Sequence, residues 1–255
     1  MVQNRRTRLR ELLITDRSQT SASAVALVCA RCVKELSVTG AGATVLSHLG
    51  NGNGNGNGNG NGNGNGSDAG HPTRGLVHAT NPTSAGLEDL QLTVGEGPCL
   101  DTFASGGPVL VADLAAEGAR WPAFTPGALA LGAAAVFSFP LQIGVVRLGS
   151  LDLYRDTPGP LTRGEVSDAL ILTDMATQGI ADEVGGHDTG DLSWLVDPHV
   201  EVHQATGMVQ VQLGVSTEAA LMRLRGHAFT HGVPLAEVAR QVVTRTLRFT
   251  QEDRP

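Results

Sequence analysis

The sequence predicts an α+β domain, in which an antiparallel sheet is flanked by helices, followed by an all-α bundle of three helices. Up to residue 184 of this 255-residue chain, short β-branched segments alternate with segments of helical periodicity. After residue 198 only helical periodicity remains, and residues 185–198 between the two regions are rich in glycine and aspartate, as linkers often are. We therefore expect domains over residues 17–184 and 199–250, with an N-terminal tail at residues 1–16.

Composition limits the functions that the chain can have. The formal net charge of −7 argues against a nucleic-acid interface spanning the whole protein, because such interfaces draw on concentrated cationic surfaces. From residue 199 onward there are six arginines and five acidic residues, so any nucleic-acid contact in the bundle must be local. No stretch reaches the roughly 18 to 20 apolar residues that cross a bilayer, and we expect a cytoplasmic protein.

The first predicted helix covers residues 22–36. Its apolar residues recur at helical spacing and form one buried stripe: Val25, Val28, Cys29, Cys32, Val33 and Leu36. Strand-type segments at residues 43–46 and 76–79 then flank eight consecutive Asn-Gly dipeptides at residues 51–66. That run has no apolar side chain to bury and a large backbone entropy to lose, so we expect residues 51–70 to be a disordered loop at a hairpin tip.

The rest of the first domain alternates between helix and strand signals. A short helix is predicted from Pro82 to near Leu92, and a longer one over residues 161–180. Strands are predicted at residues 108–111, 136–143 and 145–154. Pro140 lacks a backbone N–H and indicates that its strand is interrupted or lies at an edge.

The C-terminal region reads as three short helices. Val202, Ala205, Val209 and Leu213 share the buried stripe of the first. Gly214 ends that helix, Ser216 can cap the second, Gly232 ends the second and Pro234 opens the third. A bundle of about fifty residues is marginally stable alone, so we expect it to pack against the preceding domain or a second copy.

Motifs in the helical region resemble an ANTAR domain. They are Val202-His203-Gln204-Ala205-Thr206-Gly207-Met208, Ala220-Leu221-Met222-Arg223-Leu224-Arg225-Gly226-His227-Ala228 and Leu235-Ala236-Glu237-Val238-Ala239. The order and spacing of an Ala-x-Gly, an Ala-x-x-x-Leu-Arg-x-x-Ala and a Val-Ala agree with that family. The resemblance implies a transcription antitermination regulator, a homodimer whose helical domains bind paired stem-loops in nascent RNA.

The preceding domain resembles a GAF domain of the actinobacterial type that often accompanies ANTAR. The motifs are Gly95-Glu96-Gly97-Pro98-Cys99-Leu100-Asp101, Arg120-Trp121-Pro122-Ala123-Phe124 and Phe139-Pro140-Leu141-Gln142. The resemblance implies that this domain senses a small molecule or a protein partner. We expect the signal to shift the presentation of the helical domains through the helix at residues 161–180 and the linker.

Six residues of the bundle are candidates for RNA contact: Arg225, Arg223, His203, Gln204, Arg240 and Arg245. Arg225 is the leading one, because it stands at the margin of the second helix's apolar stripe, where its stem can pack while the guanidinium reaches outward. The same positions also fit solvated surface residues. Gly207 lies mid-helix, which favours close approach of another backbone, with packing as the first interpretation and RNA approach as the second.

Candidate ligand-binding residues in the sensor domain are Cys99, Asp101 and Trp121, although a thiol or an indole there also fits a plain core position. We expect no metal, no cofactor and no catalytic residues. One alternative is a GAF-type thiol enzyme resembling free methionine sulfoxide reductase, with Cys99 as the reactive thiol. That chemistry needs a resolving thiol, and no cysteine follows Cys99 in the chain. Another alternative is a dimeric protein-interaction module that binds no RNA.

Overall fold

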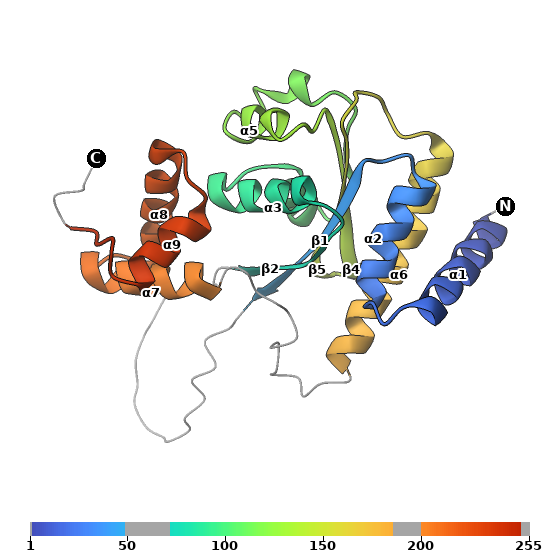
Figure 1. The fold of residues 1–255 in the computed structure, drawn as a ribbon, viewed down its shortest axis with the longest axis horizontal. Helices are drawn as coiled ribbons and strands as arrows, with labels where there is room; N and C mark the ends of the chain where they lie inside the picture. Colours follow the sequence, from blue (N-terminus) through green and yellow to red (C-terminus); the bar gives the residue numbers. More distant parts are fainter. Residues whose placement is uncertain (1, 49–71, 186–199, 251–255) are drawn as a thin grey trace.

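The computed structural model describes residues 2–48, 72–185 and 200–250, and it confirms an α+β domain followed by a helical bundle. The Asn-Gly run and almost all of the predicted linker lie outside the described residues. In Figure 1 the sheet separates α1, α2 and α6 on one side from α3 and α5 on the other, and the bundle lies next to α3. Among the described residues, no helix is long and apolar enough to cross a membrane.

The predicted helices and strands occur in the predicted order, together with short helices after residue 97 that the sequence analysis did not predict. The strands are β1 (Gly40–His48), β2 (Pro72–Ala79), β3 (Val109–Val111), β4 (Ala135–Ile143) and β5 (Val146–Arg155). The helices of the first domain are α1 (Val2–Gln19), α2 (Ala24–Glu35), α3 (Pro82–Val94), α4 (Pro98–Ser105), α5 (Phe124–Ala130) and α6 (Arg163–Gly185), with a 3-10 helix, η1, at Leu114–Glu117. The bundle consists of α7 (Val200–Leu213), α8 (Thr217–His231) and α9 (Leu235–Val243).

The sheet is antiparallel throughout, in the order β2-β1-β5-β4-β3. The predicted hairpin is confirmed, since β1 and β2 pair on either side of the Asn-Gly run. The strand around Pro140 is neither interrupted at the proline nor at the sheet edge, because β4 lies between β5 and β3. However, β3 pairs only with Val136 to Ser138, so at Pro140 the outer side of β4 has no strand partner among the described residues. A missing N–H is tolerated there.

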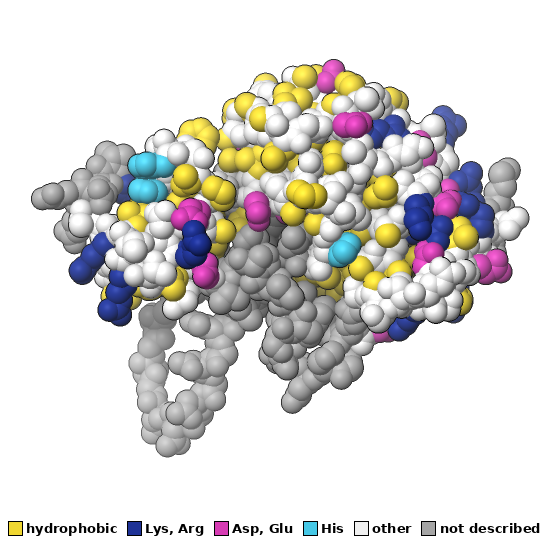
Figure 2. Space-filling model, in the orientation of Figure 1, with side chains coloured by type: hydrophobic (Ala, Val, Ile, Leu, Met, Phe, Trp, Pro, Cys, Tyr) yellow, Lys and Arg dark blue, Asp and Glu magenta, His cyan; other side chains and the backbone are white. Residues whose placement is uncertain are grey.

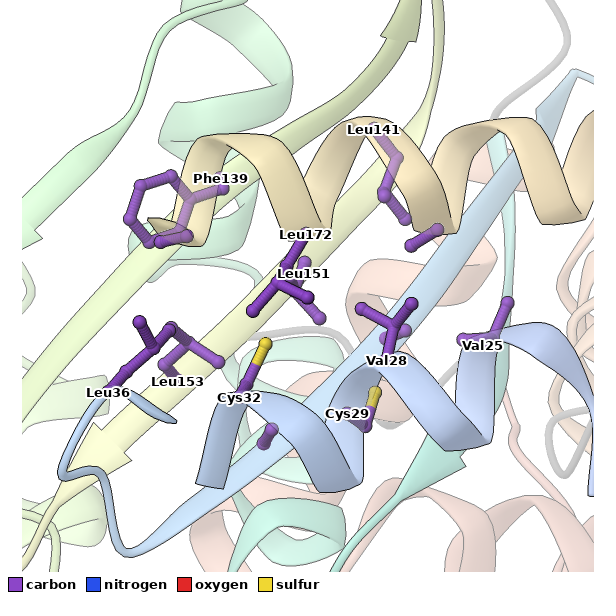
Figure 3. Close-up of a cluster of buried hydrophobic side chains, with 14 of the residues drawn as sticks. Val25, Val28, Cys29, Cys32, Leu36, Phe139, Leu141, Leu151, Leu153 and Leu172 are labelled. Atoms are coloured by element: carbon purple, nitrogen blue, oxygen red, sulfur yellow. The ribbon is translucent and has the colours of Figure 1, made fainter. Parts of the chain in front are cut away.

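The larger core lies between the sheet and the α2–α6 layer. Figure 3 shows Cys29 and Cys32 of α2 among apolar side chains that include Leu172 of α6 and Leu151 of β5. Both cysteines are fully buried, which confirms their predicted place on the buried stripe of the first helix. Along β5 successive side chains alternate between faces, so Leu151 and Leu153 face this core while Ser150, Asp152 and Tyr154 face α3.

The segment expected to be an N-terminal tail is a helix. α1 buries Leu9 completely against α2 and α6. Its arginines pair with acids of those helices: Arg5 with Asp168, Arg6 with Asp174, and Arg8 with both Glu35 and Asp168. Figure 2 shows the resulting concentration of basic side chains near the N-terminus. The sequence analysis missed this helix because its apolar stripe is short, with Leu9 buried and Leu12 and Leu13 partly buried, and the other contacts are long-range ion pairs.

Asp168 is expected to be the carboxylate on which the docking of α1 depends. Its side chain is 9 % exposed and lies 3.0 Å from Arg5 and 3.5 Å from Arg8. Asp168→Ala should lower the free energy of unfolding by about 1–3 kcal/mol, because it leaves two arginines without their shared carboxylate. Asp174→Ala is the matched control: the Arg6–Asp174 pair is solvent-exposed and should contribute less than about 1 kcal/mol. If urea unfolding showed that both variants lose the same free energy of unfolding, this role of Asp168 would be contradicted.

The start of α6 forms a reciprocal capping box. The Thr162 backbone N–H donates to Glu165 Oε2 at 2.7 Å, and the Glu165 N–H donates to Thr162 Oγ1 at 3.2 Å. Arg155 also donates to Glu165 Oε1 at 2.9 Å. Burial on its own raises the pKa of Glu165, but these hydrogen bonds and the Arg155 charge outweigh it, so the pKa lies below its ordinary value of 4.5.

Glu165→Gln should therefore reduce stability in a pH-dependent way. A carboxylate whose pKa is lower in the folded state stabilises above its unfolded pKa, and that stabilisation disappears as the pH falls through the folded value. The variant should lose about 1 kcal/mol near neutral pH, with the difference from wild type shrinking below about pH 4.5. Urea unfolding of both proteins at pH values from below about 4.5 to neutral measures this difference in the free energy of unfolding. A difference that stays constant with pH would contradict the lowered pKa.

Candidate functional site

A groove on the helical bundle holds two of its basic side chains. It lies between α8 and the segment at residues 244–250, and its volume is about 860 Å³. Its lining combines cationic, aromatic, hydroxyl and apolar groups: Ser216, Glu218, Ala219, Met222, Arg223, Gly226, His227, Thr230, Leu247, Arg248 and Phe249. The groove is therefore formed by one side of α8 together with the segment that follows α9.

Several properties of this groove suit single-stranded nucleic acid. The rings of His227 and His231 stack at 4.0 Å, and His227 meets Phe249 edge-on at 5.5 Å. Gly226 has open space where a Cβ would stand, so a ligand backbone can approach α8 closely. Arginines beside an accessible imidazole ring provide phosphate contacts and a stacking surface in one place, while Phe249 is buried behind that ring. The acidic Glu218 is the one lining residue of opposite charge.

Arg223 is the predicted RNA residue that lines the groove, whereas Arg225 faces another way. Two residues apart on a helix, their side chains lie on opposite flanks of α8. Arg225 Nε donates to the Leu92 carbonyl at the end of α3, at 3.0 Å. A Cβ built on Gly95, the left-handed cap of α3, would lie 2.9 Å from Arg225 Nη1. The leading RNA candidate is therefore engaged with the first domain.

The contact between α3 and the bundle has three parts. Leu92, which is 9 % exposed, belongs to the bundle's apolar cluster. The Leu235 N–H at the start of α9 donates to Thr93 Oγ1 at 3.2 Å, so a residue of α3 caps a helix of the bundle. The Arg225 guanidinium adds a cation beside the α3 C-terminus, where the helix dipole favours it. This contact is a second connection between the domains, besides the expected one through α6 and the linker.

The other predicted RNA residues are exposed outside the groove lining. His203 and Gln204 lie on α7, Arg240 on α9 forms an ion pair with Glu237, and Arg245 follows α9 in a left-handed conformation. Gly207 departs from the packing interpretation. It is exposed, with open space where its Cβ would stand, while Ala205 beside it is fully buried.

The first domain contains a small cavity between the sheet and α3. Its volume is about 20 Å³, enough for about one water molecule. Glu88 of α3 and Asp152 of β5 both line it, together with Gly42, Ser84, Leu87, Gln91, Pro98, Phe124, Val136, Phe137, Leu153 and Tyr154. Sequence reasoning missed both acids, since Glu88 stands beside Asp89 on an amphipathic helix and Asp152 alternates with leucines along a strand, patterns that also fit solvent exposure. This cavity is the candidate sensor site.

None of the three predicted ligand residues lines this cavity, but the Sγ of Cys99 lies within 4.8 Å of carboxylate oxygens of Glu88 and Asp152, which do line it. Cys99 is fully buried in the first turn of α4, and its N–H donates to Gln91 Oε1 of α3 at 2.8 Å. Asp101 instead pairs with Arg120 at 2.9 Å on the surface. Trp121 is 2 % exposed and packs edge-on against Phe124 at 6.0 Å in the core. The core reading of the indole is thus the one that the structure supports.

The Gly95-to-Cys99 motif has a structural explanation. Glu96 Oε1 accepts from the N–H groups of Ala123 and Phe124, at 2.6 and 3.0 Å, and so caps α5. Gly97 has a positive φ of 138°, and a Cβ there would lie 2.6 Å from Gln91 Oε1. These contacts hold the α3–α4 turn beside the cavity.

All three cysteines of the chain are buried. Burial, with the charges of Asp152 and Glu88, raises the pKa of Cys29 to about 12. Burial also raises the pKa of Cys32 well above its ordinary value. A raised pKa disfavours the thiolate that such chemistry needs, which weighs against either one as the resolving thiol of a reductase.

Comparison with known proteins identifies the C-terminal domain. Residues 196–243 match the family model of the ANTAR domain, so the bundle is an ANTAR domain, as its motifs predicted. No curated protein matches the chain.

The solved structures to which the chain is similar include GAF domains. One is the GAF domain of the phosphoenolpyruvate-protein phosphotransferase from Acinetobacter, with 12 % identity over 71 % of this chain and 94 % of that one, and a TM-score of 0.47. Another is the GAF-B domain of DevS from Mycobacterium smegmatis, with 12 % identity over 64 % and 94 %, and a TM-score of 0.40. A third is the type II free methionine-R-sulfoxide reductase from Thermoplasma acidophilum, with 13 % identity over 67 % and 96 %, and a TM-score of 0.40.

Proposed function

We propose that this chain is a signal-responsive transcription antitermination regulator whose ANTAR domain binds RNA stem-loops. The observation that carries the proposal is the groove on α8, where Arg223 and Arg248 stand beside His227 and Phe249. Unpaired loop bases can stack on the half-buried imidazole of His227 while the arginines meet phosphates, and the buried Phe249 packs against that imidazole. The GAF-like domain senses a ligand or a protein partner, and the protein acts in the cytoplasm as a homodimer.

Dimerisation supplies the affinity that the bundle's small net charge does not. Residues from 199 onward sum to one formal positive charge, which gives a weak electrostatic attraction by itself. Two bundles that each take one loop of a tandem pair make the second binding event intramolecular. A paired target therefore fits the proposed dimer better than a single stem-loop.

Regulation is proposed to use the contact between α3 and the bundle. Arg225 is held by the Leu92 carbonyl, so it meets RNA only after α8 leaves α3. The same helix carries Glu88 at the cavity one turn before Leu92, and Gln91 at the cavity directly before Leu92, while Leu92 and Thr93 contact the bundle. A signal that moves α3 is therefore expected to change how often α8 is free. His203, Gln204, Arg240 and Arg245 are proposed as further contacts on exposed faces.

The test is a gel-shift titration of the full chain with a tandem pair of short stem-loops taken from its host's leader transcripts. Binding should be at least roughly tenfold tighter to the tandem pair than to either stem-loop alone, and should weaken with salt. Duplex RNA of equal length, without loops, is the control. Equal affinity for all three RNAs would contradict loop recognition. No shift by a confirmed dimer over a range of salt would favour the protein-interaction module.

A further inference from the structure

Three potential metal ligands meet at the sensor cavity although they are distant in the sequence. A carboxylate oxygen of Glu88, the Sγ of Cys99 and a carboxylate oxygen of Asp152 all lie within 4.8 Å of one another. They come from α3, α4 and β5, so three elements converge on one point. Glu88 is 3 % exposed, Cys99 is fully buried and Asp152 is half-buried.

The surroundings hold both carboxylates in place. The Thr44 hydroxyl donates to Glu88 Oε2 at 2.9 Å, and the Ser150 hydroxyl donates to Asp152 Oδ2 at 2.6 Å. Gly42 pairs with Asp152 across the β1–β5 ladder, and a Cβ on it would stand 3.7 Å from Glu88 Oε1. Outer hydrogen bonds of this kind orient the ligands in protein metal sites.

A buried hydroxyl provides a separate indication of a missing polar partner. Ser138 is fully buried, and within the described residues its Oγ has no hydrogen-bond partner. Ser138 stands directly opposite Asp152 in the β4–β5 register, which puts both side chains on the cavity face of the sheet, with Cβ atoms about 5 Å apart. A buried hydroxyl without a partner costs about 1–3 kcal/mol, so a polar ligand at this point would remove a penalty.

We propose that Glu88, Cys99 and Asp152 bind one divalent transition-metal ion such as Zn²⁺. Two carboxylates this close in a buried site repel each other when ionised, and a divalent cation relieves that repulsion. A thiolate ligand selects borderline metals over Mg²⁺ and Ca²⁺. Three protein ligands plus a water molecule form a four-coordinate open site, and the cavity of about 20 Å³, which Glu88 and Asp152 line, has room for about one water molecule.

Binding would also link α3 to the sheet. Zinc bonds of about 2.0 Å to oxygen and 2.3 Å to sulfur would join ligand atoms that lie within 4.8 Å of one another, and would so fix the positions of α3 and α4 relative to β5. α3 ends in the contact with the bundle. An effect of the metal ion on RNA binding rests on the proposed function, in which the metal ion would be the signal. Metal binding itself does not depend on the proposed function.

The first experiment uses the wild-type chain with reduced thiols. Calorimetric titration with ZnCl₂ should give one ion per chain, and titration with CoCl₂ should produce the near-ultraviolet thiolate-to-cobalt charge-transfer band together with the visible bands of a four-coordinate ion. The absence of zinc binding, or cobalt binding without the charge-transfer band, would overturn the site.

Variants assign the ligands. Glu88→Gln, Cys99→Ser and Asp152→Asn should each weaken zinc affinity at least roughly 100-fold, since even changes beyond the direct ligands cost 10–100-fold. Cys32→Ala and Asp101→Asn are matched controls outside the cluster and should retain affinity. If Cys99→Ser fails to fold by circular dichroism, Cys29→Ala/Cys32→Ala decides, because it leaves Cys99 as the sole thiol and must keep the cobalt band. Unchanged affinity in folded Cys99→Ser, or loss of the band in the folded double variant, would overturn the proposal.

RNA titrations with ZnCl₂ or with EDTA separate the two proposals. A changed RNA affinity supports the metal as the signal. Zinc binding without any effect on RNA leaves the site standing and overturns its role as the signal. RNA binding by a chain that takes up no zinc overturns the site while the regulator remains.

Discussion

Replacing both groove arginines with glutamate, as Arg223→Glu/Arg248→Glu, is expected to weaken binding of the tandem stem-loops by roughly 100-fold. Each change removes a cation that can meet a phosphate and adds an anion in its place, and a loss of about 1.4 kcal/mol at each position is tenfold. Both residues line the same groove, so both substitutions weaken the binding of the same RNA. The slope of log affinity against log salt should also become shallower by roughly two phosphate contacts.

Arg10→Glu/Arg163→Glu is the matched control for this experiment. Both arginines are exposed on the first domain, away from the groove, and the double change alters the net charge equally. Its RNA affinity should stay within about threefold of wild type, because charges beyond a Debye length of about 8 Å are screened. Two outcomes argue against the groove as the RNA site. One is that Arg223→Glu/Arg248→Glu binds RNA as tightly as the wild type does, and the other is that the control variant loses as much RNA affinity as the groove variant.

Truncating Leu92 is expected to raise RNA affinity by about tenfold. Leu92 is the α3 side chain that belongs to the bundle's apolar cluster, so Leu92→Ala weakens the docked state without altering a proposed RNA residue. A shift of about 1.4 kcal/mol in favour of the released bundle increases the fraction able to bind RNA up to tenfold, provided that the docked state predominates. Gel-shift titration measures the affinity, and hydrogen exchange at the Leu235 N–H reports release, since that group bonds to Thr93 when docked.

Leu90→Ala distinguishes release from general destabilisation. Leu90 lies on the same helix but packs against Gly127 and the apolar cluster on that side of the sheet. The Leu90→Ala substitution removes the same side-chain atoms as Leu92→Ala but on the face of α3 that packs in the first domain. RNA affinity should therefore not change. If Leu92→Ala leaves affinity unchanged, or Leu90→Ala raises it equally, α3 does not restrain the bundle.

Most helices and strands could be predicted because their signals are local. Asn81 caps α3, Gly95 ends it in a left-handed conformation, and Ser216 and Gly232 bound α8, all within a few residues of the elements concerned. Cys29 and Cys32 were assigned to a buried stripe from spacing alone. Side-chain periodicity and backbone turn chemistry act over one or two turns of chain, so the linear sequence contains them.

The sites depend on contacts that the linear sequence does not reveal. Arg225 is the leading RNA candidate from the sequence, yet Arg223 lines the groove and Arg225 is held by α3, because a helix turns by about 100° per residue and its two flanks face different neighbours. Arg248 joins Arg223 only when the chain after α9 returns to α8.

The sequence by itself determined the two-domain architecture, the ANTAR motifs and the buried stripes of the helices, since each follows from local periodicity and composition. Only the tertiary structure decided three further matters: that α1 is docked by ion pairs, that α3 contacts the bundle, and that Glu88, Cys99 and Asp152 meet. The physical reason is that these contacts join residues far apart in the chain. Their proximity is set by sheet register and helix packing, and neither of these produces a periodic pattern in the sequence that would identify the contacting residues.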